Sequence, residues 1–107
     1  MLKSTKTILG KWKGEEDASR QIEFYQEKDG SFSGKVINDN GKNAKDGFLI
    51  FKELKYDEQS HTYKGQMMPP DAKISINATL TFSGNNRLEV VGKKFFMTKV
   101  FHLARIQ

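Results

Sequence analysis

Apolar and polar residues alternate along most of this chain with a period of two. The alternation is most regular in the segment Lys73–Phe82, where every second residue from Ile74 onward is apolar and the residues between are polar. Successive side chains of a β-strand point to opposite faces of a sheet, so this pattern predicts a strand with one buried face. No window of ten residues shows the 3.6-residue period of an amphipathic helix.

Eight segments carry this signal or a continuous apolar run, and connections rich in Gly, Asn, Asp and Pro separate them. Asp29-Gly30 is a strong hairpin signal, and Pro69-Pro70 ends a strand because proline cannot donate a ladder hydrogen bond. Phe48 begins a run of four apolar residues, which fits a strand buried on both faces or a bulge that switches the alternation. The predicted strands are Ile8–Lys13, Arg20–Glu27, Ser31–Asn38, Phe48–Tyr56, Thr62–Met68, Lys73–Phe82, Arg87–Lys93 and Phe95–Ile106.

These strands predict an all-β fold. Sequential strands joined by short turns form an antiparallel meander. A sheet of this size with one apolar face leaves long exposed edges unless it closes on itself. We therefore predict a single domain over residues 1–107, folded as an eight-stranded antiparallel up-and-down barrel.

The only Trp of the chain, Trp12, follows Gly10 by two residues, so the two share one face of a strand. Glycine allows a large ring or a neighbouring backbone to approach closely. The pair therefore predicts an indole ring that plugs one end of the closed sheet.

Several short stretches of the chain resemble a known family. Gly10-Lys11-Trp12 near the start and Arg105 near the end are similar to the signature of lipocalin-type barrels. More closely, the chain resembles the small bacterial lipocalin-like proteins of domain-of-unknown-function family 2147, which are calycin-type barrels. The stretches that carry this resemblance are Ile8–Lys13, Ile22–Tyr25 with Gly30, Gly34–Ile37, Tyr63–Gly65, Leu88–Gly92 and Ala104–Ile106.

The resemblance implies a lipocalin-like barrel in which Arg105, from the last strand, lies across the ring of Trp12. It also implies a periplasmic or secreted protein, because family members typically carry secretion leaders. It implies no activity, since none is established for the family. Two stretches depart from the family pattern. Asp39–Gly47 is shorter than the family's loop and lacks its Pro and Arg, and Phe101–Arg105 replaces an aromatic-Thr-Arg ending.

The charge of the chain bears on its partners. Its net charge is +5, with 18 Lys and Arg against 13 Asp and Glu, and no basic run exceeds two residues. Recognition of phosphates and bases favours clustered Arg with aromatic residues, so we predict no specific nucleic-acid partner. The dispersed lysines indicate a solvated basic surface, and a weak preference for anionic partners is the alternative.

The absence of cysteine excludes disulfides, thiol catalysis and thiolate zinc sites. No apolar run approaches the ~20 residues of a transmembrane helix. The first residues lack the apolar core of a signal peptide, so we expect either a cytoplasmic protein or one whose leader was removed.

A closed barrel has an interior, and its inward residues decide what it can hold. On the predicted alternation this interior is apolar and aromatic, which fits either a filled core or a pocket for a small apolar ligand. Gly34, Gly65 and Gly92 favour a cavity if they point inward, because glycine leaves space. The predicted ligand-binding residues are Phe24, Phe32, Val36, Tyr63, Met67, Ile76, Val90, Met97 and Phe101.

The sequence contains no pattern typical of a metal site or a catalytic site. His61 falls in a turn and His102 on a strand, and no spacing typical of paired histidine ligands is present. The segment 39–47 loosely resembles a calcium loop, but Ile50 stands where the bidentate Glu is required. No nucleophile elbow, P-loop or dinucleotide motif occurs. We therefore predict no metal, no cofactor and no enzymatic activity.

The sequence thus predicts a lipocalin-like protein that binds a small apolar or amphipathic ligand in the barrel without catalysis. The alternative is an interaction module that uses its basic outer surface and has a packed interior. A monomer or a weak homodimer fits either hypothesis.

Overall fold

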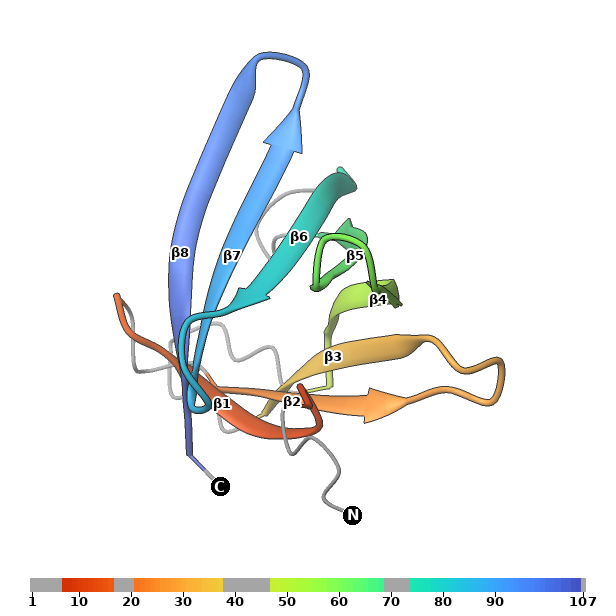
Figure 1. Cartoon of the computed structure of the whole chain (residues 1–107), viewed down its shortest axis with the longest axis vertical. Coiled ribbons are helices and arrows are strands. Elements are labelled where there is room, and N and C mark those ends of the chain that lie inside the picture. The colour runs from red at the N-terminus through yellow and green to blue at the C-terminus, as the bar shows by residue number, and fades with distance from the viewer. Residues whose placement is uncertain (1–6, 17–20, 38–46, 69–73, 107) are drawn as a thin grey trace.

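A computed structural model describes residues 7–16, 21–37, 47–68 and 74–106. Eight strands form a closed barrel in which each strand pairs antiparallel with the next, and β8 pairs with β1 (Figure 1). The predicted all-β, eight-stranded up-and-down barrel is therefore confirmed. The strands are β1 (Gly10–Gly14), β2 (Gln21–Gln26), β3 (Phe32–Ile37), β4 (Leu49–Asp57), β5 (Thr62–Met67), β6 (Ile76–Phe82), β7 (Arg87–Lys94) and β8 (Met97–Arg105).

The β2–β3 hairpin forms where the Asp29-Gly30 pair predicts it. Gly30 adopts φ 92°, a conformation that glycine takes without steric cost. The Asp29 carboxylate accepts hydrogen bonds from both the backbone N–H and the hydroxyl of Ser31, at 2.9 and 2.7 Å. Local turn chemistry therefore sets the register in which Ile22 and Phe24 share the buried face with Val36.

The apolar run at the start of β4 ends in a bulge. The pairing of β4 with β5 shifts register between Lys52 and Lys55, and Glu53 adopts φ 58°. Ile50 and Phe51 are consecutive yet both buried, at 6% and 0% exposure. A second irregularity lies within the run, since β3 pairs Gly34 with Phe51 and Lys35 with Leu49 and so skips Ile50. Of the two predicted explanations for this run, a bulge therefore accounts for the change in alternation.

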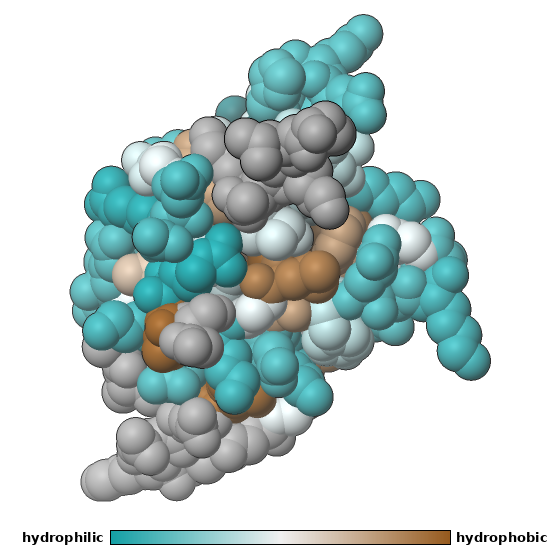
Figure 2. All heavy atoms as spheres, turned by 60° about the horizontal axis from the view of Figure 1, so that its bottom comes forward, coloured by the Kyte–Doolittle hydropathy of each residue, from teal (hydrophilic) through white to brown (hydrophobic). Residues whose placement is uncertain are grey.

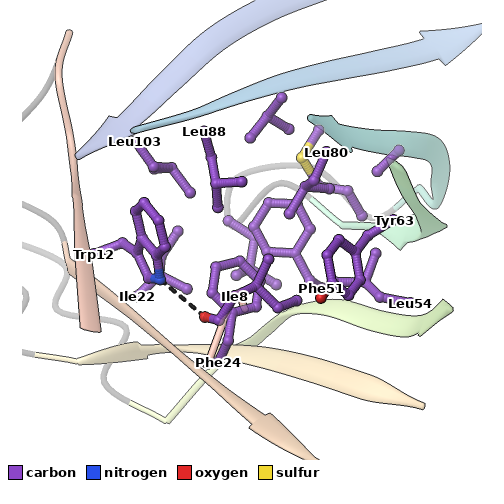
Figure 3. Close-up of a cluster of buried hydrophobic side chains, with 14 of the residues drawn as sticks. Ile8, Trp12, Ile22, Phe24, Phe51, Leu54, Tyr63, Leu80, Leu88 and Leu103 are labelled. Carbon is purple, nitrogen blue, oxygen red and sulfur yellow. Dashed lines mark hydrogen bonds between the residues drawn. The ribbon is translucent and has the colours of Figure 1, made fainter. Parts of the chain in front are cut away.

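The hydrophobic core is a cluster of buried side chains that every strand contributes to, and Figure 3 shows part of it. The rings of Phe24 and Phe51 lie 5.3 Å apart, and Tyr63 meets Phe32 edge to face at 5.5 Å. Tilted and edge-to-face arrangements are those that aromatic rings prefer. Hydrophobic burial and ring packing thus hold the sheet closed from within. The side chains below 2% exposure are Trp12, Phe24, Phe51, Ile8, Leu54, Leu80, Leu88, Leu103, Val36, Val90 and Ser33.

The β7–β8 hairpin projects beyond the rest of the barrel (Figure 1). Its partner β6 pairs only as far as Lys93, and β1 pairs with β8 only from Leu103 onward. Among the described residues, no third strand pairs with the hairpin beyond these points. Its turn is Phe95-Phe96, one to two residues later than the predicted break between Lys93 and Phe95. The sequence offers no Gly or Asn here, and the turn instead places Phe95 at φ 56°.

Gly65 offers a test of how tightly the bulge packs. A Cβ at this position would lie 2.6 Å from the Glu53 carbonyl oxygen and 2.8 Å from the Leu54 Cα. Both are backbone atoms that cannot move without disturbing the sheet. We expect Gly65→Ala to lower the free energy of unfolding by about 1–3 kcal/mol, as overpacking typically does. Urea denaturation measures this, with the exposed strand substitution Thr98→Ala as control. Equal stability of the two variants would show that the bulge yields.

Candidate functional site

One end of the barrel is closed by a plug that Trp12 and Arg105 form together. The indole is fully buried, and the Arg105 guanidinium lies 4.3 Å from its ring centroid. The two residues are direct partners in the β1–β8 ladder, so backbone pairing places the cation over the ring. A guanidinium stacked on an indole is a favourable cation–π contact. In the structure, the predicted partners Trp12 and Arg105 are therefore in contact.

Arg105 also fastens the segment that enters β1 and the β6–β7 turn. Its guanidinium donates to the carbonyls of Thr7 and Leu9, at 2.8 and 3.1 Å. It donates further to the Asn86 side-chain oxygen at 3.2 Å and the Asn85 carbonyl at 3.3 Å. The planar fork of donors suits Arg to this role in a way that Lys cannot match.

The residues before β1 complete the closed end. Ile8 is fully buried, and its carbonyl accepts a hydrogen bond of 2.9 Å from the Trp12 indole N–H (Figure 3). The Tyr63 hydroxyl is hydrogen-bonded to the Ile8 backbone and the Thr7 side chain, while burial of the ring raises its pKa. The sequence analysis predicts that Ile8 begins the first strand, but β1 begins at Gly10. Ile8 instead lies before the strand and covers the closed end of the barrel as a lid.

Figure 2 brings this end of the molecule forward. Hydrophilic residues dominate the visible surface, and a short apolar stretch shows near its centre. This largely polar surface fits a plug whose apolar groups are buried below the outer residues.

Most of the predicted ligand-binding residues point into the barrel, and one does not. Met97 is 68% exposed on the projecting hairpin. Its predicted inward position is wrong because the hairpin has left the barrel at that point, although the alternation along β8 is as expected. Phe32 and Phe101 are partly buried against the core. The fully inward members are Phe24, Val36, Tyr63, Met67, Ile76 and Val90.

Two of the three inward glycines, Gly34 and Gly65, do not leave the space that the sequence predicts. A Cβ at Gly34 would lie 2.8 Å from the Phe24 ring, and the Phe51 ring is 3.1 Å away. The space beside Gly65 holds the backbone of the β4 bulge. Glycine is required at these two positions, because a ring or a neighbouring strand occupies the place that a side chain would take. The barrel near the plug is packed.

Gly92 differs from the other two in what surrounds it. A Cβ there would meet the Cδ1 of Ile76 at 2.8 Å and the Cε of Met67 at 3.0 Å. Both atoms are the free ends of flexible side chains, and a thioether side chain adapts readily to new shapes. Met67 ends β5 and Ile76 begins β6, so all three residues lie toward the end of the barrel opposite Arg105.

Apolar side chains continue to that opposite end. Ile50 and Ile76 keep 6% and 8% of their surface exposed, and Phe101 lies half-buried across the ladder from Val90. The sequence predictions omitted Ile50, because the irregular pairing of β3 with β4 at this residue shifts the alternation by which inward positions are assigned. The unbroken apolar run from Phe48 was the signal that could have included it.

Charged groups gather outside the barrel beside β8. Arg87 donates to both carboxylate oxygens of Glu15, at 2.7 and 2.9 Å, and this contact lowers the pKa of Glu15. Hydrogen bonds from the His102 side chain and backbone lower the pKa of Glu16. Both carboxylates are exposed surface groups. Any stabilisation they give is complete above their ordinary pKa of 4.5 and is lost as the pH falls through the lowered values.

Neither histidine belongs to a metal cluster in the part of the chain that the structure describes. The His61 Nδ1 lies 3.3 Å from the Tyr56 hydroxyl, and the His102 Nδ1 lies 3.0 Å from the Glu16 carboxylate. Of the loop 39–47, only Gly47 is among the described residues, so the comparison with a calcium loop lies outside them. No helix of the described ranges is long and apolar enough to cross a bilayer.

Arg105 and Arg87 provide a matched pair for testing the plug. A lysine at position 105 has no planar group to stack on the indole, and it could keep only some of the four hydrogen bonds that the guanidinium donates. We expect Arg105→Lys to lower the free energy of unfolding by about 1.5–3 kcal/mol, the range for hydrogen bonds made by charged groups. The exposed Arg87→Lys should cost less than about 1 kcal/mol. Thermal or urea unfolding compares the two, and a smaller cost at position 105 would contradict the structural role of the plug.

Comparison with known proteins adds no assignment to this picture. No protein-family model, curated protein or solved structure matches the chain. Membership of family 2147 therefore stays a prediction from the residues quoted above.

Proposed function

We propose that this chain is a non-catalytic binding protein that takes a small apolar or amphipathic molecule into its barrel at the end opposite the plug. The observation that carries the proposal is the adaptable group of Met67, Ile76 and Gly92 near that end. Ligand sites are typically concave and apolar, with few polar groups. An eight-stranded barrel is wide enough either to fill with side chains or to hold one small ligand.

The packing of the core limits what such a ligand can be. Phe24 and Phe51 occupy the space beside Gly34, and the β4 bulge occupies the space beside Gly65. A long acyl chain reaching toward Trp12 would have to displace these groups. The site therefore suits a short or compact molecule that displaces only the ends of Met67 and Ile76. Its affinity is expected to be micromolar at best, because displacement of well-packed groups offsets the gain from burial.

The residues divide into two groups under this proposal. The ligand-facing group consists of Val36, Met67, Ile76, Val90, Gly92 and Phe101. Phe24, Phe32 and Tyr63 form the floor on which that group rests, and the lid at Ile8 closes the barrel beneath Tyr63. Ile50 joins the ligand-facing group as a residue that the sequence analysis did not name.

A second function is favoured by the filled positions at Gly34 and Gly65. These fit an interaction module that has a packed interior and binds through its outer surface. The basic character of the chain, +5 in net charge, would then direct it to anionic partners. Native mass spectrometry of protein purified from its own host separates the two functions, because a retained small molecule is expected only for the carrier.

Gly92→Ala provides the sharper test of the carrier. The added methyl group would lie where the ends of Met67 and Ile76 now pack, so both side chains would have to shift toward the site that the ligand would take. We expect the protein to bind the compact apolar fluorescent probe N-phenyl-1-naphthylamine with micromolar affinity. Gly92→Ala should weaken this binding about tenfold, since one methyl group more or less in an apolar site is commonly worth that much.

The matched control is Val91→Ala. Val91 is the adjacent residue of β7 and points to the opposite face, so its loss should leave probe affinity unchanged. Failure of the folded protein to bind the probe, or equal binding by Gly92→Ala and the parent chain, would reject the carrier function.

A further inference from the structure

The turn of the β7–β8 hairpin exposes three consecutive large apolar side chains. Phe95 is 91% exposed, Phe96 94% and Met97 68%. We call the segment Lys93–Lys99 the hairpin tip. It lies at the far end of the projecting hairpin, away from the body of the barrel (Figure 1). These rings do not contribute to the core, and exposure of adjacent aromatic groups to water is unfavourable.

The backbone of the turn makes the choice of residue more telling. Phe95 adopts φ 56°, in the left-handed region where a bulky residue is strained and where hairpin turns prefer Gly, Asn or Asp. A glycine would satisfy the turn at lower cost and would remove an exposed ring. The fold of the hairpin therefore gives no reason for Phe at this position. Strained, exposed residues of this kind are typical of sites that act on something outside the fold.

The charge of the hairpin tip is entirely positive. Lys93, Lys94 and Lys99 flank the apolar residues, and no Asp or Glu occurs from Val90 to the last residue of the sequence. Lys93 and Lys99 are exposed, while the Lys94 ammonium lies 5.5 Å from the Phe95 ring centroid and donates to the Ser75 carbonyl at 3.2 Å. The tip thus combines an apolar point with a basic collar.

We propose that the hairpin tip docks on the surface of a membrane that contains anionic lipids. Phe95, Phe96 and Met97 enter the interface between headgroups and acyl chains, where aromatic rings are favoured. Lys93 and Lys99 remain at the level of the headgroups and attract their phosphates. Apolar insertion and basic attraction together are the two signals that reversible membrane anchoring needs.

The shape of the tip favours a lipid surface over a protein partner. Its apolar residues lie at the end of a narrow two-stranded projection. Such a projection can enter the headgroup region of a bilayer but offers little area for a stable protein contact. One feature could serve a protein partner instead. On the side of β8 away from β7, the described residues place no strand beside Met97–Val100, so this edge could pair with a second copy of the chain.

The proposal is independent of the carrier function. The tip lies outside the barrel, and no residue of the tip belongs to the ligand-facing group defined above. A test of membrane docking therefore gives the same result whether or not the barrel binds a ligand.

Vesicle flotation tests the proposal with the whole chain. Liposomes of phosphatidylcholine alone are compared with liposomes of phosphatidylcholine and phosphatidylglycerol in a 3:1 ratio. We expect the protein to float with the anionic vesicles at least about tenfold more strongly than with the neutral ones, because each lysine near an anionic surface contributes roughly fivefold. Raising NaCl from about 50 to 500 mM should weaken the binding, since salt screens the lysines.

Two variants separate the contributions of rings and charges. Phe95→Gly combined with Phe96→Ser removes both rings and suits the turn, so it should fold at least as well as the parent and lose about tenfold or more in vesicle binding. Lys93→Gln with Lys99→Gln should weaken binding to anionic vesicles only. Its matched control is Lys11→Gln with Lys13→Gln, which removes the same charge from exposed positions of β1 and should have a much smaller effect.

A spectroscopic measurement complements flotation. Trp introduced by Phe96→Trp should shift its emission to the blue when anionic vesicles are added, whereas the buried Trp12 should not respond. Three results would overturn the proposal. They are absence of binding to anionic vesicles, equal binding by the Phe95→Gly/Phe96→Ser variant, and a concentration-dependent dimer that these substitutions abolish without vesicle binding by the parent chain.

Discussion

Closure of the sheet by a short ladder between β1 and β8 is the constraint on which the rest of the structure depends. Among the described residues, three ladder pairs from Trp12–Arg105 to Gly14–Leu103 join these strands, and one backbone hydrogen bond flanks the ladder on each side. Arg105 adds what the ladder lacks, because its guanidinium binds the Thr7 and Leu9 carbonyls and covers the indole. Without this closure, the edges of β1 and β8 would both be open, and the buried rings would meet water.

The same short ladder explains why one hairpin leaves the barrel. β8 is nine residues long and meets β1 only at its final three positions. β7 extends past the last residue that β6 can pair with. Strands of a barrel are staggered, so the excess length accumulates on one hairpin at one end. The closed end and the exposed aromatic turn thus lie at opposite ends of the same two strands.

The alternation of residues was sufficient to predict the strands and their order, because a half-buried strand must repeat every two residues. The contact of Arg105 with Trp12 could be expected as well, because the lipocalin-type signature that the chain resembles places an Arg of the last strand over the Trp of the first. The role of Gly34 and Gly65 could not. A glycine leaves space only if no neighbour enters it, and the neighbours that enter belong to β2 and to the β4 bulge. The overhang of Met97 was equally hidden, since it depends on where two other strands end.

The network around Arg105 also has a consequence for the order of folding. Its hydrogen bond to the Thr7 carbonyl joins residues 98 positions apart, close to the whole length of the chain. Bringing such distant segments together costs loop-closure entropy before any contact repays it. The hairpins can form early from local contacts, but the barrel cannot close until both ends of the chain meet. A chain interrupted before that meeting presents two bare strand edges, and the rate of this final encounter sets how long they are available for aggregation.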